Sequence, residues 1–451
     1  MKSLRILLAV AVLGFGIQPA QAASDPTPTS TPTSTPAPTP SVPPVPNQPH
    51  TCSIRAAMNS KDLAYFYGYV MNATTGQVYA DVRGQQQTPS ASVMKSLTAA
   101  AAIQVLTPTY QATTRVYSVP SEPGTVVIRG GGDHTLSRLD PPSYTTYKYP
   151  AKISKLAAQV LASWPTGQPI TKIILDGSYF DQPAWNTAWS NWDRTSGNIS
   201  LITGLMVDSD RANPDLTDTH YDGTRSTDPV MKAGKYFKQA LGVAASGATL
   251  VEAVTPGDAV EIGNVKSQPM SIWLDHALKY SDNTETEVIA KHAERMSGMI
   301  TDFKGVQPMV QRALRAIGID STGLVMNDAS GLAQSDRVTA KLVASVMAEA
   351  SHPTSAISSL IGYLPVSGVS GTLSGRYNGY SALARGAVHA KSGYIPGLFS
   401  LAGLVYAKDG TVLAFAGFAR QFAGKKLYAA AKPALDALTT RLFLCGAGSY
   451  Y

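Results

Sequence analysis

The chain has 451 residues, of which 44% are hydrophobic and 15% charged, and its net charge at pH 7 is +7. This length is enough for two or three domains, each with a hydrophobic core. The positive charge is spread along the chain without a basic cluster, which argues against nucleic-acid binding.

The first 22 residues have the pattern of a secretory signal peptide. Lys2 and Arg5 give a positive start, residues 6–17 are apolar, and residues 20–22 form a small-residue cleavage site. No later segment supplies the ~20 consecutive apolar residues that a transmembrane helix needs. We therefore expect an exported protein without a membrane span after signal cleavage, placed in the cell wall, in the periplasm or outside the cell.

Residues 23–50 are almost entirely Pro, Thr and Ser, a composition that cannot bury a core. We expect an extended linker here, which would hold the folded body away from the membrane or let it move. A tail without a role of its own is the alternative.

The folded part begins with the pattern of a β-hairpin, because residues 63–71 and 77–82 are β-prone and a turn-like segment separates them. Ser92 then opens a helical run that is apolar on most sides, which is typical of a buried helix. Free backbone N–H groups and the helix dipole favour negative charge at this position. Lys95 follows one turn later on the same face, so its amine should lie beside the Ser92 hydroxyl.

A long interval separates Ser92 from the next motif, which begins at Ser281. It contains strand and helix patterns of its own, at residues 113–119, 125–129, 151–163 and 172–176. We predict an inserted domain or domains at 111–263, which leaves 51–110 and 264–451 for the main domain.

The C-terminal region has the pattern of three strands and a closing helix. The strands are expected at 387–391, 399–406 and 411–418, with a tight turn at 408–410, and the helix at 424–442. Together with the first hairpin, this predicts an α+β fold in which helices cover one antiparallel sheet and the two chain ends lie close together.

The chain contains only two cysteines, Cys52 and Cys445. In an oxidising compartment a disulfide between them is reasonable, since the predicted sheet brings the two ends of the folded body together. Two unpaired thiols are the alternative.

Three short motifs occur in an informative order: Ser92-Val93-Met94-Lys95, Ser281-Asp282-Asn283 and Lys391-Ser392-Gly393. Each motif is common by itself. The ordered set is far more specific, because it supplies a nucleophile, partners for proton transfer and a cation for an anionic substrate. It predicts a serine enzyme that forms an acyl intermediate.

The catalytic roles follow from the chemistry of the side chains. Ser92 is the predicted nucleophile and needs a base, because a free hydroxyl attacks poorly at neutral pH. Lys95 can be that base if burial and nearby cations lower its pKa, and Lys391 is a candidate for such a cation. Ser281 is the predicted proton relay to the leaving amine.

The remaining motif positions are predicted to bind substrate. Asn283 offers an amide to the substrate backbone, and Lys391 and Ser392, followed by Gly393, would bind its carboxylate. The N–H groups of Ser92 and Tyr394 are the natural oxyanion-hole pair. His389 is interpreted as structural. Because no His, Cys or Asp cluster has zinc-site spacing, we expect no metal and no cofactor.

With these motifs in place, the chain resembles the class C, type-4 penicillin-binding proteins, which are D-alanyl-D-alanine carboxypeptidases and endopeptidases of peptidase family S13. The resemblance covers about 51–444, including the inserted region. His134 stands where Pro is common, and Ser392, where Thr is usual, keeps the hydroxyl. Further matching stretches begin at Gly130, Leu175, Asp228, Asp328, Leu364 and Gly371.

The resemblance implies removal of the terminal D-Ala from peptidoglycan stem peptides ending in D-Ala-D-Ala, with cleavage of cross-links as a further activity. It also implies that β-lactam antibiotics acylate Ser92. A β-lactamase and a non-catalytic peptidoglycan-binding protein are the two alternatives. The long interval between the first two motifs argues against a compact β-lactamase.

Overall fold

The computed structural model describes residues 51–143, 145–215 and 223–451. The predicted signal peptide (1–22) and the predicted linker (23–50) both lie outside these residues. None of the helices in the described part of the chain is long and apolar enough to cross a membrane.

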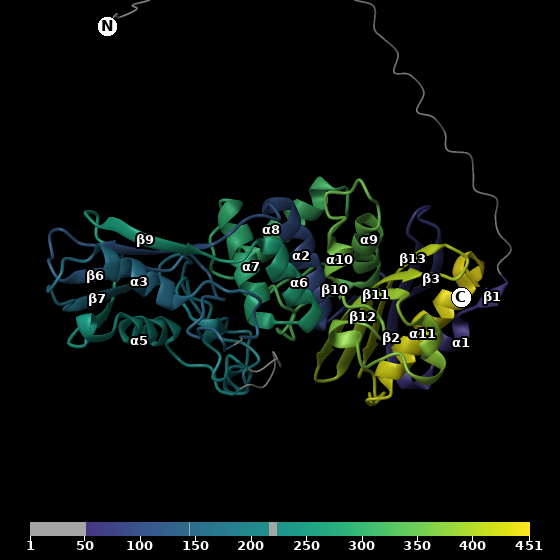
Figure 1. The fold of residues 1–451 in the computed structure, drawn as a ribbon. Coiled ribbons are helices and arrows are strands. Elements are labelled where there is room, and N and C mark those ends of the chain that lie inside the picture. Colours follow the sequence, from purple (N-terminus) through teal and green to yellow (C-terminus); the bar gives the residue numbers. More distant parts are fainter. Residues whose placement is uncertain (1–50, 144, 216–222) are drawn as a thin grey trace, which may run out of the picture. The chain divides into compact units, whose positions relative to one another are not determined.

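The main sheet is antiparallel throughout and joins strands from both ends of the chain in the order β11-β12-β13-β2-β3 (Figure 1). The strands are β2 (Tyr65–Asn72), β3 (Val78–Val82), β11 (Val388–Ile395), β12 (Leu398–Tyr406) and β13 (Val412–Arg420). The predicted α+β class is therefore confirmed, and the predicted strands of this sheet are present with boundaries shifted by a few residues.

Alternate residues of the central strands enter two different cores, as the period of two in a strand requires. Leu401 and Phe415 belong to the core beneath the C-terminal helix. Ala402 and Phe418 belong to the larger core that the other helices share. Because both faces are covered, β12 is buried along almost its whole length.

The larger core is formed by helices packed around α2 (Met94–Val105), whose run Ala99–Ala102 is buried. Small side chains on several sides allow close approach of the neighbouring helices. The helices around it are α6 (Met270–Tyr280), α7 (Asn283–Met296), α8 (Val306–Ala316), α9 (Ala340–Ala350) and α10 (Leu360–Tyr363).

The opposite face of the sheet is covered by the C-terminal helix α11 (Ala431–Cys445), which begins later than the predicted residue 424. Gly424 has a left-handed φ of 78°, and Phe422 pairs with Lys425 in a small turn. Pro433 then lies in the first turn of the helix, where a missing N–H is tolerated.

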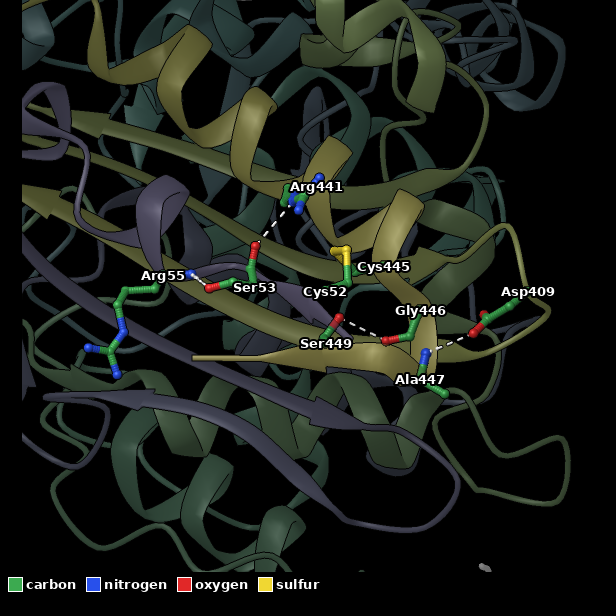
Figure 2. Close-up of a disulfide and its surroundings, with 9 residues drawn as sticks. All are labelled: Cys52, Ser53, Arg55, Asp409, Arg441, Cys445, Gly446, Ala447 and Ser449. Atoms are coloured by element: carbon green, nitrogen blue, oxygen red, sulfur yellow. Dashed lines mark hydrogen bonds between the residues drawn. A yellow bond between two sulfur atoms is a disulfide. The ribbon is translucent and has the colours of Figure 1, made fainter. Parts of the chain in front are cut away.

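The two ends of the folded chain are joined covalently. Cys52 and Cys445 form a disulfide with their Cα atoms 5.3 Å apart (Figure 2). Beside it, β1 (Cys52–Ser53) pairs in parallel with β14 (Ser449–Tyr450), and the Arg441 side chain donates to the Ser53 carbonyl. The first helix, α1 (Arg55–Met58), follows directly.

A second five-stranded sheet lies within the interval between the first two motifs, in the order β8-β7-β6-β5-β9. The strands are β5 (Thr113–Ser118), β6 (Thr125–Arg129), β7 (Lys172–Asp176), β8 (Thr249–Glu252) and β9 (Val260–Lys266). β6, β7 and β8 are parallel neighbours, and β5 is antiparallel to both β6 and β9.

Helices α3 (Ile153–Ser163) and α5 (Pro229–Leu241) pack on this second sheet and enclose a hydrophobic core of its own. The amphipathic pattern of α3 and the Asp228 side chain that caps α5 explain why these segments are helical. Three further short elements are α4 (Asn191–Thr195) and the paired strands β4 (Gln87–Thr88) and β10 (Val338–Thr339).

Candidate active site

Ser92 lies in a single 3-10 turn, Ala91–Val93, that leads into α2 at Met94. The predicted helix therefore begins with a tighter turn and not at Ser92 itself. Ala91, just before it, has a positive φ of 46°, an unusual conformation for a residue with a side chain. This strained approach places the Ser92 side chain at the edge of a cleft.

Lys95 is fully buried, and its Nζ has three partners. It lies 3.0 Å from Ser92 Oγ, 2.6 Å from Asn283 Oδ1 and 2.7 Å from the Ser330 carbonyl oxygen. Burial lowers the pKa of Lys95 to about 8, although the carboxylates of Asp328 and Glu287 act in the opposite direction. A substantial fraction of the amine is thus neutral in mildly alkaline solution.

The second motif forms the connection between α6 and α7. Ser281 ends α6 in a left-handed conformation with φ of 62°, and Asp282 caps α7 by accepting the N–H of Glu285. Asn283 is the first residue of α7, where its amide contacts Lys95 Nζ through Oδ1 and donates to the Asn198 carbonyl through Nδ2.

Lys391, on β11, is buried behind the second motif. Its Nζ donates to Ser281 Oγ at 2.9 Å and to the Ser392 carbonyl at 2.8 Å. Burial, and then the positive charge of Lys95, lower the pKa of Lys391 well below its usual value. A substrate carboxylate next to it would favour the charged form again.

The two lysines affect each other differently from the sequence prediction. We expected Lys391 to help lower the pKa of Lys95, but burial causes that shift, and the charges that act on Lys95 are carboxylates, which raise it. The repulsion between the two amines instead lowers the pKa of Lys391.

The strand after Lys391 runs directly beside the nucleophile. A Cβ atom on Gly393 would lie 2.9 Å from the Ser92 backbone nitrogen and 2.4 Å from Ser400 Oγ, so only glycine fits there. The Ser392 hydroxyl is hydrogen-bonded to Thr372 Oγ1 at 2.7 Å. Tyr394 follows with its ring 57% exposed.

These elements enclose a cleft of about 630 Å³, a volume typical of small-molecule and peptide sites. Six of the residues singled out in the sequence line it: Ser92, Ser281, Asn283, Ser392, Gly393 and Tyr394. Lys95 and Lys391 lie buried behind them. His389 is not among the lining residues, and its ring packs on Tyr406.

Glu287 is an important residue that the sequence analysis missed. Its carboxyl group accepts the N–H groups of Ala329 and Ser330 and so fixes the loop whose Ser330 carbonyl contacts Lys95. Burial, and then the charge of Asp328, raise the pKa of Glu287 to about 8. Its position four residues after Asn283, on the same face of α7, was the available signal.

Among the described residues, one group of buried side chains has the types and spacing of metal ligands: His276, Asp282 and Glu285. The sequence spacing gave no sign of this group, because His276 belongs to α6 and the other two side chains to the following turn and helix.

The structure of penicillin binding protein 4 (dacB) from Haemophilus influenzae matches with a TM-score of 0.71 at 18% identity, over 86% of this chain and 97% of that chain. The chain has the same fold.

The chain belongs to the D-Ala-D-Ala carboxypeptidase 3 (S13) family, whose model matches residues 53–224 and 220–442. It is 35% identical over 400 residues to carboxypeptidase DacB of Mycolicibacterium smegmatis, covering 88% of this chain and 84% of the relative. It is 27% identical over 408 residues to a D-alanyl-D-alanine carboxypeptidase of Actinomadura, covering 76% and 75%. The resemblance inferred from the motifs is confirmed.

Proposed function

We propose that this member of the carboxypeptidase family removes the terminal D-Ala from peptidoglycan stem peptides through an acyl-enzyme at Ser92. The observation that carries the proposal is the buried Lys95 amine, 3.0 Å from Ser92 Oγ, at the edge of a cleft. A base within hydrogen-bond distance is the arrangement that activates a serine hydroxyl.

In the first half of the reaction, Ser92 Oγ attacks the carbonyl carbon of the penultimate D-Ala. Its proton passes to the neutral amine of Lys95 as the new C–O bond forms. The N–H groups of Ser92 and Tyr394 stabilise the negative charge that develops on the carbonyl oxygen. The C–N bond then breaks, and the departing D-Ala amine takes up a proton through Ser281, which is linked to Lys391.

In the second half, water attacks the ester carbonyl carbon and gives a proton to the Lys95 amine. Ser92 Oγ takes up a proton from Lys95 as the C–O bond to the enzyme breaks, and the shortened peptide leaves. The Asn283 amide binds the peptide backbone in both halves, and Lys391 with Ser392 binds the terminal carboxylate in the first half, before D-Ala departs. Gly393 lets the strand pass close enough to Ser92 for this contact.

β-Lactams are proposed as inhibitors, because their strained amide and carboxylate present the same groups to the same site. The structure of the Haemophilus penicillin binding protein 4 has also been determined in complex with a β-lactam. An extracytoplasmic location follows from the substrate and agrees with the disulfide.

The test is to locate the acyl-enzyme. After incubation with benzylpenicillin and proteolysis, peptide mass mapping should find the adduct on the peptide that carries Ser92, and the Ser92→Ala variant should have none. An adduct that persists in Ser92→Ala would refute the assignment. Defined monomeric and cross-linked muropeptides, analysed in the same way, will show whether release of D-Ala or cleavage of cross-links dominates.

A β-lactamase remains the rival activity, and a chromogenic cephalosporin separates the two. We expect one slow burst equal to the enzyme concentration, since acyl-enzymes of penicillin-binding proteins hydrolyse slowly. Fast multiple turnover would instead identify a β-lactamase. Binding of stem peptides without any D-Ala release would identify a non-catalytic protein.

A further inference from the structure

A cluster of five buried residues lies behind the second motif: His134, Tyr147, His276, Asp282 and Glu285, here called the Glu285 cluster. Resting on the function proposed above, we propose that His134 and Tyr147 are positioning residues, which hold the Ser281-Asp282-Asn283 turn so that its side chains meet the two catalytic lysines. Both come from the interval between the first two motifs, so the proposal also gives that interval a role in catalysis.

The turn is short and contains one strained residue. Only Ser281 and Asp282 separate α6 from α7, and Ser281 has the left-handed conformation, which costs about 1 kcal/mol in a residue with a Cβ. On its cleft side, Ser281 contacts Lys391 and Asn283 contacts Lys95. A small shift of the turn would therefore break both contacts at once.

Tyr147 holds the turn through Asp282. Its hydroxyl donates to Asp282 Oδ2 at 3.1 Å and is hydrogen-bonded to Ser209 Oγ at 2.6 Å. The other oxygen, Asp282 Oδ1, accepts the N–H of Glu285 at 3.0 Å. Through the Tyr147 hydroxyl, the Asp282 carboxylate thus ties the start of α7 to two segments of the inserted interval.

His276 and His134 flank the Glu285 carboxylate on its two sides. His276 Nδ1, on α6, lies 2.6 Å from Glu285 Oε2, so this contact joins α6 to α7 across the turn. His134 Nε2 lies 3.3 Å from Glu285 Oε1, an ion-pair distance at which these two atoms make no hydrogen bond. The His134 ring also packs edge-on against Trp273, with 4.6 Å between ring centroids, which fixes its orientation.

The charges in the cluster favour these contacts. Burial alone would lower the pKa of His276, but the negative charges of Glu285 and Asp282 raise it above its usual value. Burial would raise the pKa of Asp282, yet His276, the Glu285 N–H and the buried cation Arg211 lower it. Both Asp282 oxygens and Glu285 Oε2 are thus hydrogen-bonded to protein groups, whereas Glu285 Oε1 has no hydrogen bond and only the His134 ring beside it.

The decisive experiment uses Tyr147→Phe, which removes one hydroxyl and keeps the ring. The matched control is Tyr377→Phe: Tyr377 is equally buried, its hydroxyl is hydrogen-bonded to Thr439 Oγ1 at 2.9 Å, and neither residue lines the cleft. The rate constant of acylation by benzylpenicillin, the affinity of the preceding non-covalent complex and the melting temperature are measured for each.

We expect Tyr147→Phe to be acylated about 10-fold more slowly with little change in non-covalent affinity. The reason is that a small displacement of catalytic groups slows the chemical step more than it weakens binding. Tyr377→Phe should lower the melting temperature by a similar amount and acylate at the wild-type rate. Equal acylation rates in Tyr147→Phe and the wild type would overturn the proposal. So would a loss of rate in both Tyr147→Phe and Tyr377→Phe that is proportional to their loss of melting temperature.

His134 provides an independent pair of variants. His134→Phe keeps the packing on Trp273 but removes the nitrogen that faces Glu285, and should also slow acylation. His134→Gln restores a donor and should recover part of the rate. No difference between these two variants would show that the nitrogen is irrelevant and contradict the role of His134.

Two further outcomes are distinguishable. If the wild-type protein forms no adduct at Ser92, the proposed function fails and the positioning role fails with it. If wild-type acylation is normal but drops after treatment with EDTA and returns with Zn²⁺, a metal ion holds the cluster and the direct hydrogen-bonded arrangement is overturned.

Discussion

Lys95 must be a neutral amine before it can accept the Ser92 proton. Because burial lowers its pKa to about 8, the neutral fraction rises about tenfold per pH unit below that value and levels off above it. We predict that the acylation rate constant for benzylpenicillin follows this curve, measured in single-turnover experiments from pH 6 to 9.5. A rate that is flat between pH 6.5 and 8 would contradict the assignment of Lys95 as the base.

Two variants sharpen this prediction. Lys95→Ala should acylate about 100- to 10,000-fold more slowly, which is the usual contribution of a general base. Lys291 is the control, since it is a buried lysine on α7 whose pKa is also lowered by burial, and its Nζ contacts the Thr301 carbonyl outside the cleft. Lys291→Met should keep the inflection near pH 8.

The loop that begins at Asp328 depends on α7 for its conformation. Glu287 accepts two backbone N–H groups of this loop, and Asp328 accepts those of Gly331 and Ala333. The loop in turn presents the Ser330 carbonyl to Lys95. One carboxyl group on a helix therefore helps to orient Lys95, the proposed base.

Substitution of Glu287 should separate its hydrogen bonds from its charge. Glu287→Gln keeps an acceptor for the two N–H groups and should retain most of the acylation rate. Glu287→Leu leaves those buried groups unpaired, at about 1–3 kcal/mol each, and should lose both stability and rate. A Leu variant that acylates like Gln would show that the loop holds its shape without this contact.

The raised pKa of Glu287 also predicts a pH dependence of stability. Burial raises this pKa to about 8 from an ordinary 4.5, so the folded state favours the protonated form. The contribution of the protonated Glu287 carboxyl to folding stability is fully present below about pH 4.5 and is lost as the pH rises through 8. Melting temperatures should show wild type losing stability relative to Glu287→Gln over this range, and a constant difference would contradict the shift.

The sequence predicted the parts of the site that are local and missed those that are assembled by the fold. The hairpin β2–β3, the strands β12 and β13 and the Ser92–Lys95 spacing all follow from short-range patterns. β8 and β9 were missed because they are half-exposed edge strands without a run of buried residues. Glu287, His134 and Tyr147 act through contacts between distant segments, and such buried polar contacts leave no periodic signal.

The molecule as a whole is closed by the bond between Cys52 and Cys445, which are 393 positions apart. Closing so long a loop stabilises the folded chain by at most roughly 6 kcal/mol in the chain-entropy model, and strain or residual structure in the unfolded chain reduces this value. The bond lies at the junction of β1 and β14, beside the C-terminal end of α11, and none of the cysteine atoms lines the cleft.

We therefore predict that loss of the disulfide affects stability and not chemistry. The double variant Cys52→Ser/Cys445→Ser should melt at a lower temperature than wild type and acylate at an unchanged rate at 25 °C, because Ser92 and its partners are held by the sheet and by α2 and α7.

Arg441→Gln is the control: it removes the side-chain contact to the Ser53 carbonyl at the same junction but leaves the covalent bond, and should have a much smaller effect on melting. Non-reducing peptide mapping of the wild-type protein establishes that the bond is present. If the double variant melted normally, the paired strands alone would be sufficient to hold the chain ends, and if it acylated slowly, the junction would have to be coupled to the cleft through α11 and β12.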